Sequence, residues 1–209
     1  MSLMEGTIGN LGRIARKLVT SIRLGAFGEQ VTAPGRGKYG EPCENGEIFL
    51  AANSATQALS VNSATATGII LTNPAGSGVR AEILDVCVSL ASLPAGQSSL
   101  ILTGAFYTAE DVAVVHTTPL TVRCSLLGSE KKAACLADSA ATIPTPAIVR
   151  VLGGAPAATV ATSTAFPPFI RDEISGLLVL EPNTVISLQA LTTAMTVVAS
   201  ITWREIPLE

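Results

Sequence analysis

The sequence predicts an all-β fold, an antiparallel β-sandwich or barrel preceded by an N-terminal arm. Short runs rich in Val, Ile, Leu and Thr recur from Glu47 to the C-terminus, and Gly, Pro, Asn and Ser separate them. Several runs alternate between apolar and polar residues, as half-buried strands do. No pattern of helical period is long enough to indicate an α/β fold. Many short strands separated by turn signals are typical of sandwiches and barrels.

Residues 1–46 differ from the rest and are predicted to form an arm that is partly helical or extended. They contain six of the 13 Lys and Arg residues and are rich in Gly. The candidate docking residues are Leu11, Arg13, Ile14, Arg16, Lys17, Leu18, Ile22 and Arg23, whose apolar members recur at helical spacing. The basic residues Arg13, Arg16, Lys17 and Arg23 suit binding to an acidic protein surface, to nucleic acid or to a membrane surface. The alternative interpretation is an ordinary flexible terminus whose charges are solvated.

Residues 47–209 form the predicted β domain. We expect its strands at 48–51, 67–71, 81–91, 98–107, 112–116, 120–126, 147–152, 169–174, 177–180, 185–191 and 196–206. In the run 81–91, the phase expected to face the core consists of Glu82, Leu84, Val86, Val88 and Leu90. Cys87 lies in the same apolar run and is interpreted as a small core residue.

Composition narrows the class of protein. The chain has 209 residues, which suits one main domain with residues to spare for an arm. Hydrophobic residues make up 48% and charged residues 14%, so intrinsic disorder is not expected over most of the chain. The net charge of −3 argues against a broadly basic nucleic-acid binder. A chain with so few charges needs to cover its surface, by oligomerisation or by docking onto a larger assembly.

Neither a membrane helix nor a secretory signal is expected. The longest apolar candidate, 186–201, is interrupted by Ser, Gln and Thr residues, whereas a membrane-spanning helix needs about 20 mostly apolar residues. The N-terminal segment lacks the continuous apolar stretch of a signal peptide. Reduced thiols are therefore expected at Cys43, Cys87, Cys124 and Cys135, although two disulfides in any of three connectivities are arithmetically possible.

Few side chains in this sequence are suited to catalysis or to metal binding, and we predict no catalytic, cofactor-binding or metal-binding residues. The cysteines form no C-x-x-C pair of the kind that zinc sites use. His116, the only histidine, is interpreted as a structural residue at a strand end, and no G-x-S-x-G motif accompanies it. Neighbouring acids on a strand point to opposite faces rather than across a sugar cleft. The acidic pairs 110–111 and 172–173 are therefore interpreted as solvated acids in loops or at strand edges.

The segment 35–40, GRGKYG, matches the glycine pattern G-x-G-x-x-G. That pattern binds dinucleotides where a strand turns tightly into a helix whose N-terminus holds the pyrophosphate. Here Pro34 precedes the motif and the residues after it, EPCENG, predict no helix. We therefore interpret it as a basic glycine-rich loop.

Three groups of segments, taken in their order along the chain, suggest a resemblance to a known class of proteins. They are RLGAFGEQ (23–30) with GKY (37–39) and GEIF (46–49), LTNPAGSG (71–78), and SLQAL (187–191) with ASITWREIP (199–207). This order resembles small virion structural proteins of tailed bacteriophages, which are found beside capsid genes. The resemblance implies a β-sandwich, often jelly-roll-like, a multimeric state, an N-terminal segment that docks the protein to the particle, and no catalytic residues.

The resemblance leaves head decoration, head fibre and tail component open. The leading hypothesis is a non-enzymatic capsid decoration or cement protein, working as a homotrimer in the virion after assembly in the host cytoplasm. Its partners would be itself and the major capsid protein or another virion protein, without a membrane, a specific nucleic acid or a cofactor. One alternative is a tail or fibre component that binds a host receptor or glycan, against which the scarcity of aromatics counts. Another is a hydrolase, which would need a cleft joining His116 to Ser and Asp.

Overall fold

The computed structural model describes residues 38–106, 114–157 and 169–208. Residues Glu41–Glu209 form one compact unit. Within the described ranges the secondary structure consists of one short helix and twelve strands. These are α1 (Gly40–Glu44), β1 (Ile48–Ala52), β2 (Gln57–Ala58), β3 (Thr65–Asn73), β4 (Val79–Ser92), β5 (Ser98–Phe106), β6 (Val115–Pro119), β7 (Arg123–Cys124), β8 (Leu136–Thr142), β9 (Ala147–Ala155), β10 (Phe169–Leu180), β11 (Thr184–Ala190) and β12 (Thr196–Pro207).

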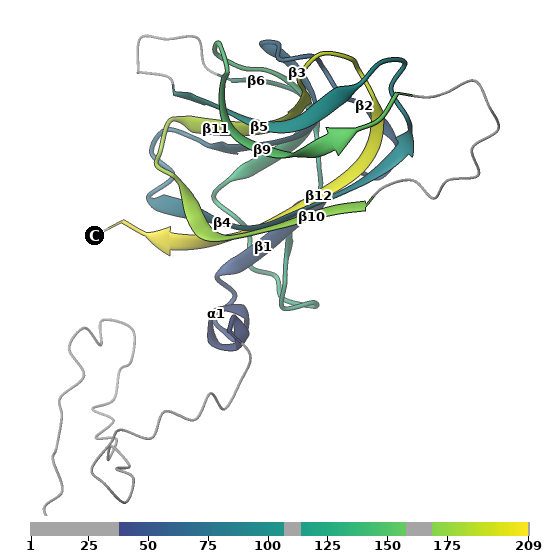
Figure 1. Ribbon diagram of the computed structural model, residues 1–209. Coiled ribbons are helices and arrows are strands. Elements are labelled where there is room, and N and C mark those ends of the chain that lie inside the picture. The colour runs from purple at the N-terminus through teal and green to yellow at the C-terminus, as the bar shows by residue number, and fades with distance from the viewer. Residues whose placement is uncertain (1–37, 107–113, 158–168, 209) are drawn as a thin grey trace, which may run out of the picture. The chain divides into compact units, whose positions relative to one another are not determined.

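The strands form two antiparallel sheets that pack against each other (Figure 1), so the predicted all-β sandwich is confirmed. The first sheet has the order β10-β4-β12-β1-β7, with β2 also paired to β12. The second sheet has the order β6-β8-β3-β11-β5-β9. The links β3–β4, β4–β5, β9–β10, β10–β11 and β11–β12 each pass from one sheet to the other. A jelly-roll arrangement of these links stays a prediction.

Most predicted strands coincide with observed ones within a few residues, but two predictions were wrong and two strands, β2 and β8, were not predicted. The segment 120–126 is a connection whose strand residues are only Arg123–Cys124. The segment Leu136–Thr142, LADSAAT, is a strand that was not predicted, because it lacks the β-branched and aromatic residues that mark strands. The segments 169–174 and 177–180 are one strand, β10, whose register shifts at Ser175 and Gly176, both with positive φ.

The burial pattern of β4 reverses in the middle of the strand. The pairing of β4 with β12 skips Leu84, which is therefore a bulge residue. Ala81 and Ile83 face the core before the bulge, and Val86, Val88 and Leu90 face it afterwards. The predicted phase was therefore right after the bulge and wrong for Glu82, because one extra residue exchanges the faces of a strand. Cys87 lies half-buried on the opposite face and is not a core residue.

The main core lies between the sheets and consists mostly of Ala, Val, Leu and Ile side chains. Its largest member is Trp203 on β12, which is fully buried. Phe49 is paired with it across the β1–β12 ladder, with ring centroids 6.2 Å apart. A second, smaller cluster lies outside this core and consists of Ala66, Ile70, Ala105, Val114, Ala141, Ile143 and Val185. Because aromatics are scarce, small aliphatic side chains supply most of the apolar burial.

A buried asparagine joins the two sheets beside β1. The side-chain nitrogen of Asn53 donates to the carbonyl of Gly68 on β3 at 2.8 Å, and its side-chain oxygen accepts from the backbone N–H of Ala199 on β12 at 3.1 Å. Gly68 has φ +129°, and a Cβ there would lie 2.4 Å from a methyl group of Leu59. Glycine is therefore required at this position, both by the backbone conformation and by the close approach.

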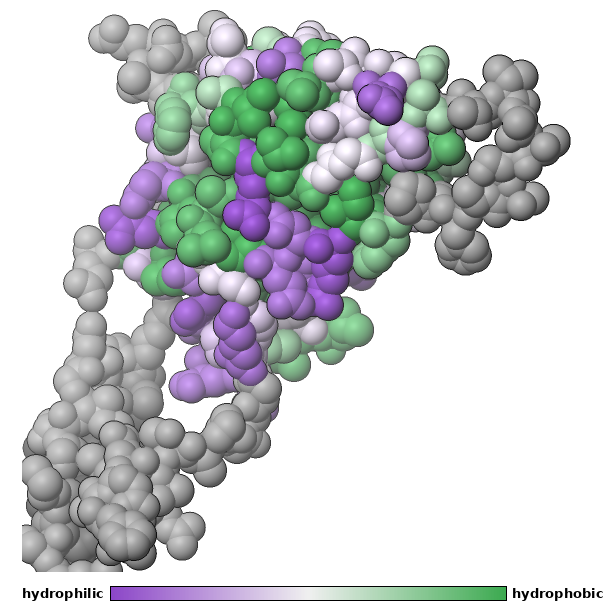
Figure 2. Space-filling view, in the orientation of Figure 1, coloured by the Kyte–Doolittle hydropathy of each residue, from purple (hydrophilic) through white to green (hydrophobic). Residues whose placement is uncertain are grey.

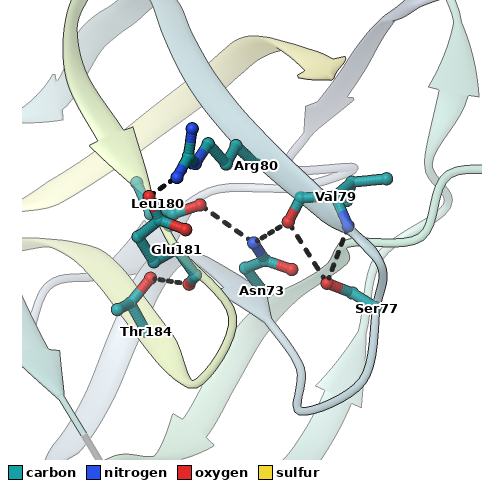
Figure 3. Close-up of polar contacts among 7 residues, drawn as sticks. All are labelled: Asn73, Ser77, Val79, Arg80, Leu180, Glu181 and Thr184. Carbon is teal, nitrogen blue, oxygen red and sulfur yellow. Dashed lines mark hydrogen bonds and ion pairs between the residues drawn. The ribbon is translucent and has the colours of Figure 1, made fainter. Parts of the chain in front are cut away.

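A second buried asparagine closes one end of the sandwich (Figure 3). Asn73, the third residue of the segment LTNPAGSG, donates from its side-chain nitrogen to the carbonyls of Val79 and Leu180 at 2.8 and 2.9 Å. These carbonyls belong to the start of β4 and the end of β10. Beside them Arg80 forms an ion pair with Glu181 at 2.6 Å. The segment LTNPAGSG, which contributed to the resemblance, therefore has a structural role, because its Asn73 connects the start of β4 to the end of β10.

We expect Asn73→Ala to lower the free energy of unfolding by about 1–3 kcal/mol, because two buried carbonyls lose their donor. The side-chain oxygen of Asn73 has no partner among the described residues, so its removal costs no further hydrogen bond. The measurement is equilibrium unfolding in urea. Ser77→Ala is the control, since Ser77 makes only long, partly buried bonds to Val79. Equal losses for the two variants would show that Asn73 is not a special connection.

Candidate functional site

The predicted docking residues of the arm, Leu11, Arg13, Ile14, Arg16, Lys17, Leu18, Ile22 and Arg23, all lie outside the described residues. The arm and its role in docking therefore stay predictions. Of the predicted arm 1–46, the structure describes only 38–46, which contains α1 and the turn into β1.

The glycine-rich loop is followed by a helix, which the sequence did not predict. Helix α1 begins at Gly40, the last glycine of the motif, and ends at Glu44. It has only five residues, and Glu41 in its first turn places a negative charge where a phosphate would need to bind. Lys38, within the motif, lies 4.9 Å from the ring centre of Tyr39. This geometry does not favour a nucleotide site.

His116 is held by a buried carboxylate. Its Nδ1 atom lies 2.6 Å from Oδ2 of Asp138, a residue with no solvent exposure on β8. His116 lies on the neighbouring strand β6, and its side chain is 30% exposed. Among the described residues, no hydroxyl or thiol group is hydrogen-bonded to its other ring nitrogen, as the nucleophile of a triad would be. The pair fits the structural role expected for His116 and adds Asp138, which sequence reasoning did not single out.

The acidic pair on β10 is divided between the two sides of the strand, as predicted. Asp172 accepts two hydrogen bonds from the guanidinium of Arg150, at 2.5 and 2.9 Å. Glu173 points the other way and forms an ion pair with Arg171. Because Arg150 lies on β9 and Asp172 on β10, their pair joins the edges of the two sheets. The other acidic pair, 110–111, lies outside the described residues.

The most buried carboxylate after Asp138 belongs to Glu205 on β12. It accepts hydrogen bonds from the backbone N–H groups of Ala134 and Cys135, both at 2.9 Å, and from the indole Nε1 of Trp203 at 3.1 Å. Residues 134 and 135 lead into β8 in the other sheet. Glu205 therefore links the centre of the first sheet to the start of a second-sheet strand. In the sequence, Glu205 follows Trp203 by two residues and so lies on the same face of the strand. This alternation was the signal from which the burial of Glu205 could have been predicted.

All four cysteines are free thiols in the structure. Burial raises the pKa of Cys135 strongly, and the charge of Glu205 raises it further. Burial also raises the pKa of Cys87, and Asp85 adds to this effect. Thiols with raised pKa values are poor nucleophiles at neutral pH. In the part of the chain that the structure describes, no group of three or more His, Cys, Asp or Glu side chains could hold a metal ion.

The surface feature that stands out is apolar. Seven large side chains between 45% and 80% exposed lie on or beside the edge strands β9 and β10, and we call them the β9–β10 flank: Phe106, Ile148, Val149, Val151, Phe169, Leu177 and Val179. Strands β9 and β10 face the viewer in Figure 1, and Figure 2 shows several hydrophobic areas on this side with hydrophilic side chains between them. At one end, an apolar hollow of about 120 Å³ is lined by Phe106, Val149 and Val179, among others.

Comparisons with known proteins add nothing to this picture. A scan against family models, a search of curated proteins and a search of solved structures each gave no match. In the described ranges, the structure contains no helix that is both long and apolar enough to cross a membrane.

We expect Glu205→Gln to lower the free energy of unfolding by about 2–3 kcal/mol, because the new amide N–H₂ group faces backbone donors that need an acceptor. Fluorescence of Trp203, the only tryptophan, reports both unfolding and the loss of its own acceptor. Glu173→Gln is the matched control, since its side chain is 64% exposed and surface ion pairs contribute about 0–1 kcal/mol. If Glu205→Gln is no worse than this control, the carboxylate is not a structural link.

A reductant is expected to leave the melting temperature unchanged, because the four thiols are free and no disulfide stabilises the sandwich. The measurement is thermal unfolding followed by circular dichroism, with and without the reductant. A native disulfide typically contributes about 2–5 kcal/mol, so a drop of several °C with reductant would contradict the expectation.

Proposed function

We propose that the protein is a non-enzymatic virion structural protein, a capsid decoration or cement protein that binds and stabilises a phage head as a homotrimer. The observation that carries the proposal is a β-sandwich with a broad, exposed flank rich in apolar side chains, in a chain whose positive charge is concentrated near the N-terminus. The resemblance of three groups of segments to phage virion proteins supports it. Two of these segments build the turn around Asn73 and the central strand β12, which fits a structural rather than a chemical role.

Charge distribution supports a division of tasks between the arm and the sandwich. Residues 1–46 contain six Lys and Arg against four Asp and Glu, whereas residues 47–209 contain seven against twelve. An acidic capsid surface would attract the first segment and repel the second. Docking would therefore run through the arm, with apolar contact from Leu11, Ile14, Leu18 and Ile22. The stabilisation would be mechanical, because a subunit that bridges neighbouring capsid proteins resists the outward pressure of packaged DNA.

A tail or fibre component that binds a receptor or glycan is the second candidate. An open hollow of about 420 Å³ favours it, because Gln97, Ser98, Ser99 and Thr192 supply polar groups to its lining. Sugar sites also use exposed aromatic rings, and the residues lining this hollow include none. The exposed rings of Phe106 and Phe169 belong to the β9–β10 flank instead.

The arm hypothesis is tested by deleting residues 1–40, which leaves the compact unit from Glu41 onward. We expect a folded sandwich that no longer binds phage heads, since the positively charged docking residues are gone. Sedimentation of heads with bound protein measures occupancy, and circular dichroism verifies the fold. If the truncated protein still decorates heads at full occupancy, attachment lies on the sandwich and the arm is a bystander.

A charge-reversal pair separates specific docking from general charge. Arg13, Arg16 and Lys17 changed together to Glu should weaken head binding most at low salt, where screening is weakest. Arg123, Lys131 and Lys132 changed to Glu make the same change in net charge on the sandwich and should have a much smaller effect. Equal losses would mean that net charge, rather than the arm, controls binding.

A further inference from the structure

The exposed apolar area of the β9–β10 flank is large for an isolated soluble domain. Taking about 150 Å² for a fully exposed large apolar side chain, its seven side chains leave roughly 600 Å² open to solvent. The largest apolar patch on a typical monomer is about 300–600 Å² and is often functional. A standard protein interface buries about 800 Å² on each partner. The flank therefore supplies most of the apolar area that one side of a stable interface needs.

The charged side chains of the flank are paired with one another or with neighbouring residues. The one cation of β9, Arg150, forms a two-bond pair with Asp172. On β10, Arg171 and Glu173 lie between Phe169 and Leu177 and form an ion pair, and Arg171 also pairs with Asp85. Because these pairs leave no excess of positive charge, the flank favours an apolar partner over a phosphate backbone, a lipid headgroup or an acidic protein surface.

The edge strand β9 is protected against backbone pairing but exposes apolar side chains. Soluble proteins protect exposed edges with Lys, Pro, β-bulges or inward-pointing charges. Strand β9, AIVRVLGGA, has neither Lys nor Pro, but Arg150 reaches across to Asp172 of the other sheet, and its exposed positions include Ile148 and Val151. Two register shifts in its pairing with β5 make continuous strand pairing with another molecule unfavourable, so contact through side chains is expected instead.

We propose that the β9–β10 flank is the surface through which copies of this chain associate. A second copy is the occupant that the observations favour, because it brings a face of the same apolar area with the same paired charges. Symmetric oligomers bury the same region of every copy, against itself in a dimer or, in a trimer, with one part of the region against another part on the next copy. Interface cores are also depleted in charge and enriched in aromatic residues. Leu177 and Phe169, which are 76% and 63% exposed, supply apolar anchors towards the two ends of β10, with Leu177 near the hollow lined by Phe106, Val149 and Val179.

This inference deepens the self-association part of the proposed function, but it concerns the protein alone and needs no phage particle. The test is analytical ultracentrifugation of the full-length protein over a range of concentrations. We expect the wild type to form a dimer or trimer. Leu177→Asp and Phe169→Glu should each weaken association by roughly tenfold or more, as anchor residues do. Leu127→Asp is the matched control, because Leu127 is 78% exposed and lies beyond β7, at the opposite edge of the first sheet.

Each outcome decides the matter. A monomeric wild type overturns the inference, and so does an oligomer that tolerates both flank variants or is equally weakened by Leu127→Asp. A monomer that binds phage heads only with an intact flank overturns it too and assigns the flank to a virion protein. An oligomer that dissociates through the flank variants but never binds heads supports the inference while the proposed function fails. Circular dichroism of each variant verifies that dissociation does not arise from unfolding.

Discussion

The carboxylate of Glu205 is the constraint that holds the rest of the sandwich in place. It lies on β12, which pairs with β1, β2 and β4 and so organises the first sheet. A buried carboxylate is costly unless donors surround it, and here the donors are the indole of Trp203 and two backbone N–H groups leading into β8. Satisfying Glu205 therefore fixes the position of a second-sheet strand against the centre of the first sheet. Apolar packing between the sheets is not directional, so a fully satisfied polar link of this kind adds specificity to it.

Asn53 and Asn73 are further buried polar side chains that link the two sheets. Asn53 ties β1 to β3 and β12, and Asn73 ties the start of β4 to the end of β10. With Glu205 they connect the sheets at several separate points, and each link is directional where apolar packing is not. Arg150 and Asp172 add a link at the edges. Together these directional links resist sliding of one sheet over the other.

The strands with strong alternation were predictable because one buried face leaves a period of two in the sequence. Strand β8 was not, since LADSAAT becomes a strand through its pairing with β3 and β6, which no local pattern reveals. The bulge at Leu84 was equally hidden, because a single unpaired residue depends on the partner strand. The flank was invisible for a further reason: Ile148, Val151 and Leu177 look like core residues, and only the sheet order places them at edges. The positive charge of the arm could be predicted from the sequence, because counting charged residues needs no knowledge of the fold.

Under the proposed function, the arm and the flank are complementary in physical terms. Docking through Arg13, Arg16 and Lys17 would rest on charge, which is screened by salt and weak for each contact. Association through the flank would rest on apolar burial, which salt does not screen. An oligomer carries several arms, so once one arm is bound the others act at high effective concentration, and overall binding exceeds that of any single arm by orders of magnitude. A weakly binding arm and an apolar flank on one chain thus give strong attachment that neither would provide alone.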